Sequence, residues 1–260
     1  MQALRLPAAR GWGWLVEAFG LYRRNPPLLV LMTMNYWLQY FMVFLVPLVG
    51  PLAANVLLQA ISVTVMNGCR AVDQRRPFAA ELLWSGFLRN RIALFKLGGT
   101  YLLCVVVMVG VLFALNGGAL LELTGAGAEA AEEAARDAEL MSLLYTAALL
   151  TLPLVLSFWF APMLVAWNDV PPLKALFFSI VAVLRNWPAF AVYGASVVAL
   201  SAVVPALLRA AVSVLPGAAG TLVGAAVSLA MIFVLMPTLF ASIYVSYREV
   251  FAPPTADVTV

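Results

Sequence analysis

The feature that most limits how this chain can fold is a stretch of 45 residues, from Asn25 to Cys69, without any Asp, Glu, Lys or Arg. A helix that crosses the hydrocarbon core of a bilayer needs about 20 consecutive apolar residues, so this stretch is long enough for two crossings. Within it, Pro47-Leu48-Val49-Gly50-Pro51 is typical of a tight turn. The stretch therefore predicts two membrane-spanning helices, Pro27–Val46 and Leu52–Cys69, joined by a short turn.

The composition extends this interpretation to all 260 residues. Hydrophobic residues make up 64% of the chain and charged residues only 10%, whereas soluble domains are roughly 45–50% apolar and about 25% charged. These proportions exclude a soluble globular domain, a disordered chain and a disulfide-linked scaffold. Further apolar stretches predict four more spans, which completes an all-α bundle of six: Ile92–Leu115, Met141–Trp167, Trp187–Leu208 and Gly220–Val245.

The basic residues are concentrated on one side of the predicted bundle. Six spans place both termini on the same side, and 13 of the 15 lysines and arginines fall there. Only Arg136 and Arg209 fall on the other side, which carries six acidic residues in the segment 116–140. Because loops rich in lysine and arginine stay in the cytoplasm, we expect cytoplasmic termini and a periplasmic acidic loop at 116–140, in a bacterial inner membrane.

The dipeptide Arg-Asn occurs three times, each time between a short segment and a predicted pair of spans. The short segments, Trp12–Arg24, Phe78–Arg89 and Pro172–Arg185, are too short to span and suit cytoplasmic interfacial helices. We therefore expect one transmembrane domain, residues 1–251, made of three parallel pseudo-repeats at about 12–69, 78–167 and 172–247. The tail 252–260, which contains Pro253-Pro254, is expected to be disordered.

The three Arg-Asn corners are the first candidate sites. Asn25 and Asn186 are closely followed by proline, which is typical of a helix N-cap with proline in the first turn. An arginine beside a helix N-terminus also favours an anion. Two interpretations stay open: topological anchoring by headgroup contacts, or specific sites for anionic lipid headgroups or a phosphorylated ligand. The candidate residues are Arg24, Asn25, Arg89, Asn90, Arg185 and Asn186.

Four amide side chains in the first two spans form a second candidate cluster. Asn35 and Gln39 share one helix face because they are four residues apart, and Asn55 and Gln59 do the same on the next helix. A turn near Val49 places Gln39 and Gln59 at the same depth, so we expect a hydrogen bond between them, worth on the order of 1 kcal/mol. The alternative is a polar substrate site lined by these four amides.

Small residues and prolines predict how the later spans pack and bend. Gly220, Gly224 and Ser228 form a stripe of small residues that favours close helix packing, either within the chain or at a dimer face. Prolines at positions 153, 162, 205 and 237 predict kinks.

Residue types that commonly carry catalysis are scarce in this sequence. The chain has no histidine, and Cys69 and Cys104 do not form a C-x-x-C pair, so we interpret both as small buried side chains. It has no carboxylate pair at membrane depth, no nucleotide-binding loop and no nucleophilic-serine motif. The sequence therefore favours a protein that is not an enzyme and has no cofactor, no metal and no nucleic-acid partner.

Six motifs spread over most of the chain carry a family resemblance: Met1-Gln2-Ala3-Leu4, Arg24-Asn25-Pro26, Met66-Asn67-Gly68-Cys69-Arg70, Phe158-Trp159-Phe160-Ala161-Pro162, Lys174-Ala175-Leu176-Phe177-Phe178-Ser179 and Leu184-Arg185-Asn186-Trp187. With these motifs the chain resembles an uncharacterised family of proteobacterial, chiefly β-proteobacterial, inner-membrane proteins. It is also distantly similar to YciC-like proteins and to the membrane domain of some glycerophosphodiester phosphodiesterases. The resemblance implies a multi-span bundle and no particular activity.

The leading hypothesis is a lipid-interacting scaffold or an accessory subunit in envelope homeostasis. Its expected partners are anionic headgroups of the cytoplasmic leaflet, together with a second copy of the chain or another membrane protein. The alternative is a transporter or channel for a small or lipid-like molecule. A cavity at mid-membrane lined by the four amides would favour transport, and a packed interior would favour the scaffold.

Overall fold

The computed structural model describes residues 3–124, 133–212 and 218–251, and every regular element in this part of the chain is helical. Six helical stretches in it are long and apolar enough to span a bilayer, which confirms the predicted number. They are Pro26–Phe44, Gly50–Asp73, Arg91–Leu115, Met141–Asn168, Trp187–Leu208 and Leu222–Val250.

Each of three helical hairpins is preceded by a short helix. The first group is α1 (Arg10–Arg24), α2 (Pro26–Phe44) and α3 (Gly50–Asp73). The second group is the 3₁₀ helix η1 (Ala80–Phe87), α4 (Arg91–Thr124), α5 (Glu133–Phe158) and α6 (Ala161–Asn168). The third group is α7 (Pro172–Arg185), α8 (Trp187–Val198), η3 (Ala199–Val203), α9 (Val204–Val212), α10 (Ala218–Ala230), η4 (Met231–Leu235) and α11 (Met236–Val250).

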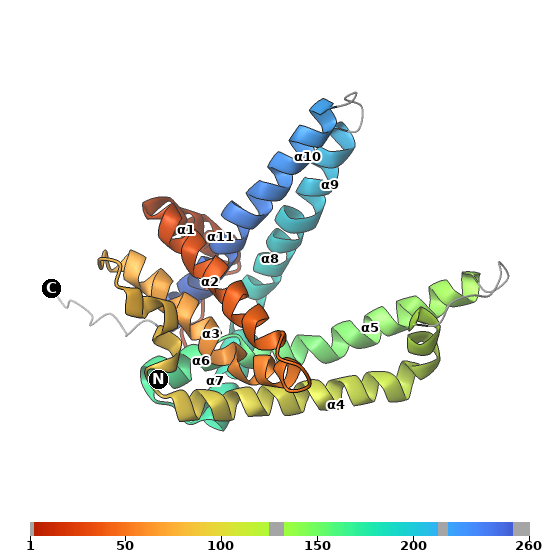
Figure 1. Cartoon of the computed structure of the whole chain (residues 1–260), viewed down its shortest axis with the longest axis horizontal. Helices are drawn as coiled ribbons and strands as arrows, with labels where there is room; N and C mark the ends of the chain where they lie inside the picture. The colour runs from red at the N-terminus through yellow and green to blue at the C-terminus, as the bar shows by residue number, and fades with distance from the viewer. Residues whose placement is uncertain (1–2, 125–132, 213–217, 252–260) are drawn as a thin grey trace.

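The hairpins leave a common base and point in different directions (Figure 1). We use the word base for α1, α6, α7, α11 and the second half of α3, residues 60–73, where most of the buried side chains lie. The arm formed by α4 and α5 diverges from the arm formed by α9 and α10. In the third and fifth spans only 11% of the residues in the most apolar part are therefore buried. In the second span, which enters the base, 56% are buried.

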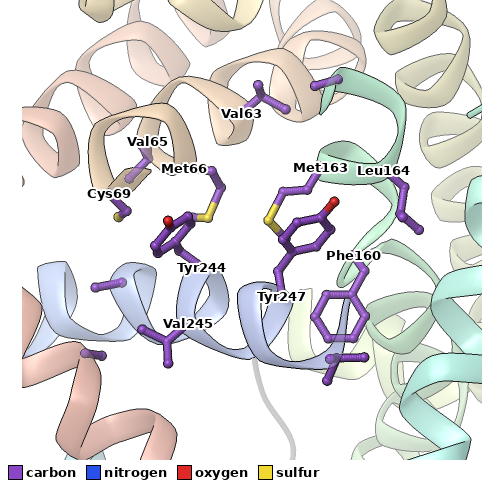
Figure 2. Close-up of a cluster of buried hydrophobic side chains, with 14 of the residues drawn as sticks. Val63, Val65, Met66, Cys69, Phe160, Met163, Leu164, Tyr244, Val245 and Tyr247 are labelled. Carbon is purple, nitrogen blue, oxygen red and sulfur yellow. The ribbon is translucent and has the colours of Figure 1, made fainter. Parts of the chain in front are cut away.

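The core of the base is built around α11 (Figure 2). Tyr244 of α11 lies beside Met66 of α3, and Tyr247 of α11 lies beside Met163 of α6. All four side chains are buried. α11, from the third group, is therefore packed between α3 of the first group and α6 of the second. This packing holds the three groups together at one end.

Two glycines allow the backbones of neighbouring helices to meet. A β-carbon at Gly11 of α1 would lie 2.0 Å from the carbonyl oxygen of Ala189, and one at Gly98 of α4 would lie 1.8 Å from that of Val56. No side chain fits at such distances, so these contacts require glycine. The predicted stripe of small residues differs: nothing lies within 4 Å of a β-carbon at Gly224, so that glycine is not used for packing within the chain.

Prolines interrupt the spans at three of the four predicted positions. The fourth span is broken before Pro162, and the π-helical turns η3 and η4 come directly before the helices that contain Pro205 and Pro237. Proline has no N–H and leaves a carbonyl of the preceding turn without its partner, so the backbone bonds shift to a wider turn or end there. Pro153 is different, because α5 continues through it.

The ends of the second arm differ from the predicted boundaries. α4 continues to Thr124, beyond the predicted end at Leu115, because Ala119, Leu120 and Leu121 are good helix formers. α5 begins at Glu133, eight residues before the predicted start of the fourth span at Met141. The centre of the acidic segment and the predicted tail 252–260 lie outside the described residues.

Candidate functional site

The first Arg-Asn corner confirms the predicted cap and shows an ion pair that was not predicted. The Asn25 side chain accepts a hydrogen bond from the backbone N–H of Leu28 over 3.2 Å, at the start of α2. Arg24 donates to a carboxylate oxygen of Asp73, 3.2 Å away at the end of α3. The arginine of this corner therefore already has an anionic partner within the chain.

The second corner binds a carboxylate of the chain itself. Asn90 and Asp169 both have left-handed backbone conformations, with φ of 53° and 54°. Arg89 donates to Asp169 over 2.9 Å, and the Asn90 amide donates to the same carboxylate and to the carbonyl of Val165. The hydrogen bond from Asn90, followed by the charge of Arg89, holds the pKa of Asp169 below its ordinary value. The anion bound at this corner is thus the carboxylate of Asp169, which joins the corner to the end of α6.

The third corner holds the N-terminal segment. Asn186 occupies the predicted N-cap position of α8, with Pro188 in the first turn, but it is fully buried and its side chain makes no cap hydrogen bond. Its Oδ1 accepts from the backbone N–H of Leu6 over 2.8 Å, and its Nδ2 donates to the carbonyls of Leu4 and Ala182 over 2.9 Å each. Burial explains the difference, since an enclosed amide must find partners for both of its ends.

Arg185 differs from the other two corner arginines. It is exposed at the end of α7, and no hydrogen bond or ion pair joins its side chain to the residues that the structure describes. Three corners that are alike in sequence are therefore different in structure, and only the third presents an open cation.

A network of charged side chains links α1, α3 and α11 across the base. Arg10 bonds Glu249 over 2.6 Å and also bonds Glu17, and these two hydrogen bonds raise the pKa of Arg10. Arg248 donates hydrogen bonds to two carboxylates, that of Glu17 over 2.9 Å and that of Asp73 over 2.8 Å. With Arg24, which also bonds Asp73, the network contains three arginines and three carboxylates, so most of its charge is neutralised internally.

The carboxylates of this network and of the second corner were not predicted from the sequence as site residues. Before the tail, the predicted cytoplasmic side contains only five acidic residues, and four of them form the ion pairs just described: Glu17, Asp73, Asp169 and Glu249. The signal was their scarcity among many basic residues. An acidic side chain in a region with many basic residues is expected to form an ion pair with one of them.

The four amides do not form one cluster. Asn35 and Gln39 both donate to the carbonyl of Leu83 in η1, over 2.8 and 2.6 Å. The Oε1 atom of Gln39 is buried without a partner, so the predicted hydrogen bond from Gln39 to Gln59 is wrong. Sequence reasoning could not foresee that η1 packs against this hairpin and supplies a backbone acceptor.

Asn55 and Gln59 instead line a cavity of about 370 Å³ between α3, α4, α5, α6 and α11. The cavity also includes Ser62 and Thr151, but neither Asn35 nor Gln39 contributes to it. The Asn55 amide donates back to the carbonyl of Pro51 over 2.8 Å. Only half of the predicted amide cavity is therefore formed.

An apolar groove of about 640 Å³ is lined by α2, α5, α7, α8 and α11. No charged side chain lines it; the lining consists of aliphatic and aromatic residues, among them Trp37, Trp159 and Trp187. The polar atoms of two lining residues bond to α11: the Tyr193 hydroxyl to Ser242 over 2.8 Å, and the Trp159 indole to Ser246 over 3.3 Å. The groove therefore presents a surface similar to hydrocarbon.

Comparison with known proteins gives one informative relative. A probable inner membrane protein of Burkholderia thailandensis is 36% identical over 202 residues, which cover 75% of this chain and 74% of the relative. No protein-family profile and no solved structure matches the chain significantly. The relative's description names a membrane location and no activity.

Proposed function

This chain belongs to the same family of inner-membrane proteins as the Burkholderia thailandensis relative, and from that premise we propose that it is a lipid-interacting scaffold without enzymatic activity. Such a scaffold would act in envelope homeostasis, by itself or as an accessory subunit of a membrane complex. Its partners would be anionic phospholipids of the cytoplasmic leaflet.

One observation carries the proposal: the spans are joined at a packed base and separate beyond it. Four of the six candidate spans are between 11% and 22% buried, so most of their surface is left for lipid or for other membrane proteins. The apolar groove, lined by α2, α5, α7, α8 and α11, adds a recessed surface of the same hydrocarbon character. A shape of this kind suits a protein that organises its surroundings, since interacting surface is its largest feature.

We further propose that the base lies at the cytoplasmic face, with both termini on that side. The positive-inside rule supports this orientation. The short helices support it as well, because α1 exposes Trp12 and Phe19, and α7 exposes Phe177, while their other faces are buried in the core. Amphipathic helices with exposed aromatic residues suit the headgroup region. The order of short helix, corner and hairpin, found three times, supports the three pseudo-repeats.

A transporter or channel is the second candidate function, and the smaller cavity is the observation that favours it. Asn55, Gln59, Ser62 and Thr151 bring polar atoms to a cavity that is lined by five helices. Polar groups inside a membrane protein often mark a substrate path. The absence of Asn35 and Gln39 from this cavity weakens the case relative to the prediction.

Native mass spectrometry of the full chain, gently extracted from its own membrane, tests the proposal. We expect retained anionic phospholipid on a protein of 28.0 kDa, or a larger assembly that also contains lipid. A bare monomer without retained lipid would contradict the lipid-interacting role. Substrate uptake into proteoliposomes that is lost on changing Gln59 to Leu would instead support the transporter.

A further inference from the structure

The groove and the open arginine are adjacent. Arg185 lies between Leu184 and Trp187 in the sequence, and both of these neighbours line the groove. We propose that the groove holds one acyl chain of an anionic phospholipid, with its phosphate bound by Arg185; this inference rests on the proposed lipid-interacting function. It assigns a particular lipid site to one of the three corners, whereas the sequence treats all three alike.

The length of the groove matches one leaflet. Along α8 its lining runs from Trp187 to Val198, and eleven residues of helix rise by roughly 16 Å. The hydrocarbon core of a bilayer is about 30 Å thick, so one leaflet contributes about 15 Å. An acyl chain that enters at the level of Trp187 would therefore follow the groove to the middle of the membrane.

The chemistry of the lining selects hydrocarbon as the occupant. The lining contains no charged group, and Tyr193 and Trp159 bond inward to α11. The groove is also accessible from outside, because Leu152, Trp187 and Val198 are between 57% and 64% exposed. In a bilayer, the molecules that reach an open apolar recess at this depth are lipid tails.

The charge at one end selects an anionic headgroup. Arg24 and Arg89 are bonded to Asp73 and Asp169, whereas Arg185 has no such partner among the described residues. An arginine at the edge of the hydrocarbon region extends its guanidinium to the phosphate level, where it can form paired hydrogen bonds. Trp187 belongs to the residue type that prefers this level.

The structure offers a variant that fills the groove without disturbing the helix. Gly194 lines the groove, and nothing lies within 4 Å of a β-carbon built on it. Gly194→Leu therefore places a side chain in the space assigned to the lipid. Gly110→Leu is the matched control, because Gly110 is equally open but lies on α4, outside the groove.

The test uses the full chain, delipidated and then exposed to equal amounts of phosphatidylglycerol and phosphatidylcholine, with retained lipid read by native mass spectrometry. We expect wild type to retain one phosphatidylglycerol. Arg185→Gln should lose the preference for it by about tenfold, the effect of one charge-assisted contact. Gly194→Leu should lose the lipid, whereas Gly110→Leu and Arg24→Gln should match wild type. Thermal unfolding midpoints would verify that each variant is folded.

The outcomes separate this inference from the proposed function. If wild type retains anionic lipid and both Arg185→Gln and Gly194→Leu retain it equally, the groove site is wrong and the broader lipid-interacting role stands. If Arg24→Gln or Arg89→Gln lowers retention instead, the lipid binds at another corner and the assignment to Arg185 fails. If wild type retains no lipid at all, both proposals fail.

Discussion

Arg10 and Glu249 lie 239 positions apart in the chain and form an ion pair, with the arginine Nε 2.6 Å from Oε1 of the glutamate. The other oxygen of Glu249 accepts a hydrogen bond from the indole of Trp14 over 2.6 Å. One carboxylate at the end of α11 therefore fixes two positions on α1. This contact joins the first and last helices of the base and explains why their ends remain together while the hairpins diverge.

Changing Glu249 to Gln should destabilise the base. The substitution keeps the shape but removes the charge, and one amide oxygen cannot replace two carboxylate oxygens as acceptors for Arg10 and Trp14. We expect a loss of about 1–3 kcal/mol, seen as a lower thermal midpoint by tryptophan fluorescence in detergent. Glu81→Gln is the control, because Glu81 is exposed. Equal midpoints for the two variants would show that the pair contributes little.

The hydrogen bonds that hold the N-terminal segment to Asn186 can be tested by changing Asn186, and Asn25 as a control, to Asp. Asn186→Asp keeps the acceptor for Leu6 but loses the donor to the carbonyls of Leu4 and Ala182, and it buries a charge beside them. We expect faster amide exchange at Leu6, measured by hydrogen–deuterium exchange. Asn25→Asp should have little effect, because a carboxylate caps a helix as well as an amide does. Unchanged amide exchange at Leu6 in Asn186→Asp would show that Asn186 does not hold the N-terminal segment.

Gly98 and Gly99 are neighbours on α4 in opposite environments. A β-carbon at Gly98 would lie 1.8 Å from the Val56 carbonyl oxygen, whereas nothing lies within 4 Å of one at Gly99. Gly98→Ala should therefore push α4 away from α3 and destabilise the protein by about 1–3 kcal/mol. Gly99→Ala should be neutral, or stabilising by up to about 1 kcal/mol. Thermal midpoints in the same detergent decide, and the reverse order would contradict the observed packing.

The six spans could be predicted from the sequence because each is a long apolar stretch, and hydropathy alone identifies such helices. The prolines at 162, 205 and 237 were equally informative, since a missing N–H acts locally. By contrast, the partners of Asn186 and Gln39 come from segments far away in the sequence. The amide pattern gives the helix face of Gln39 but does not show that Leu83 lies opposite.

The corners show the same limit at the candidate site. Arg24, Arg89 and Arg185 each precede an asparagine, and their difference depends on where Asp73 and Asp169 lie after folding. The groove could not be predicted from the sequence either, because its lining comes from five helices whose apolar residues resemble any other lipid-facing residues. Patterns within a helix can be predicted from the sequence, whereas pairings between helices require the packed structure.

The orientation of the base can be tested with two engineered cysteines. Val49 lies in the turn between α2 and α3 and is 60% exposed, and Gln74 is exposed just after α3, at the base. In a Cys104→Ala background, a membrane-impermeant maleimide applied to intact cells should label Val49→Cys and spare Gln74→Cys. Cys69 is buried and should not react. Labelling of Gln74→Cys alone would reverse the topology and place the base in the periplasm.

The contact of Asp169 with Arg89 and Asn90 should make stability depend on pH in one direction. The pKa of Asp169 in the folded protein lies below its ordinary value of 3.8, chiefly because of the hydrogen bond from Asn90. The folded state therefore favours the charged carboxylate. The stabilising contribution is fully present above the ordinary pKa and is lost as the pH falls through the lower, folded value.

Asp169→Asn is the appropriate variant, because asparagine tolerates the left-handed backbone at this position. At pH 7 wild type should unfold at a higher temperature than the variant, by a modest margin since both partners are exposed. The margin should stay constant down to about pH 5 and shrink below 3.8. High salt at pH 7 should also reduce it, because exposed ion pairs are screened. A margin that persists unchanged in acid would mean that the charge of Asp169 does not hold α6 to the second corner.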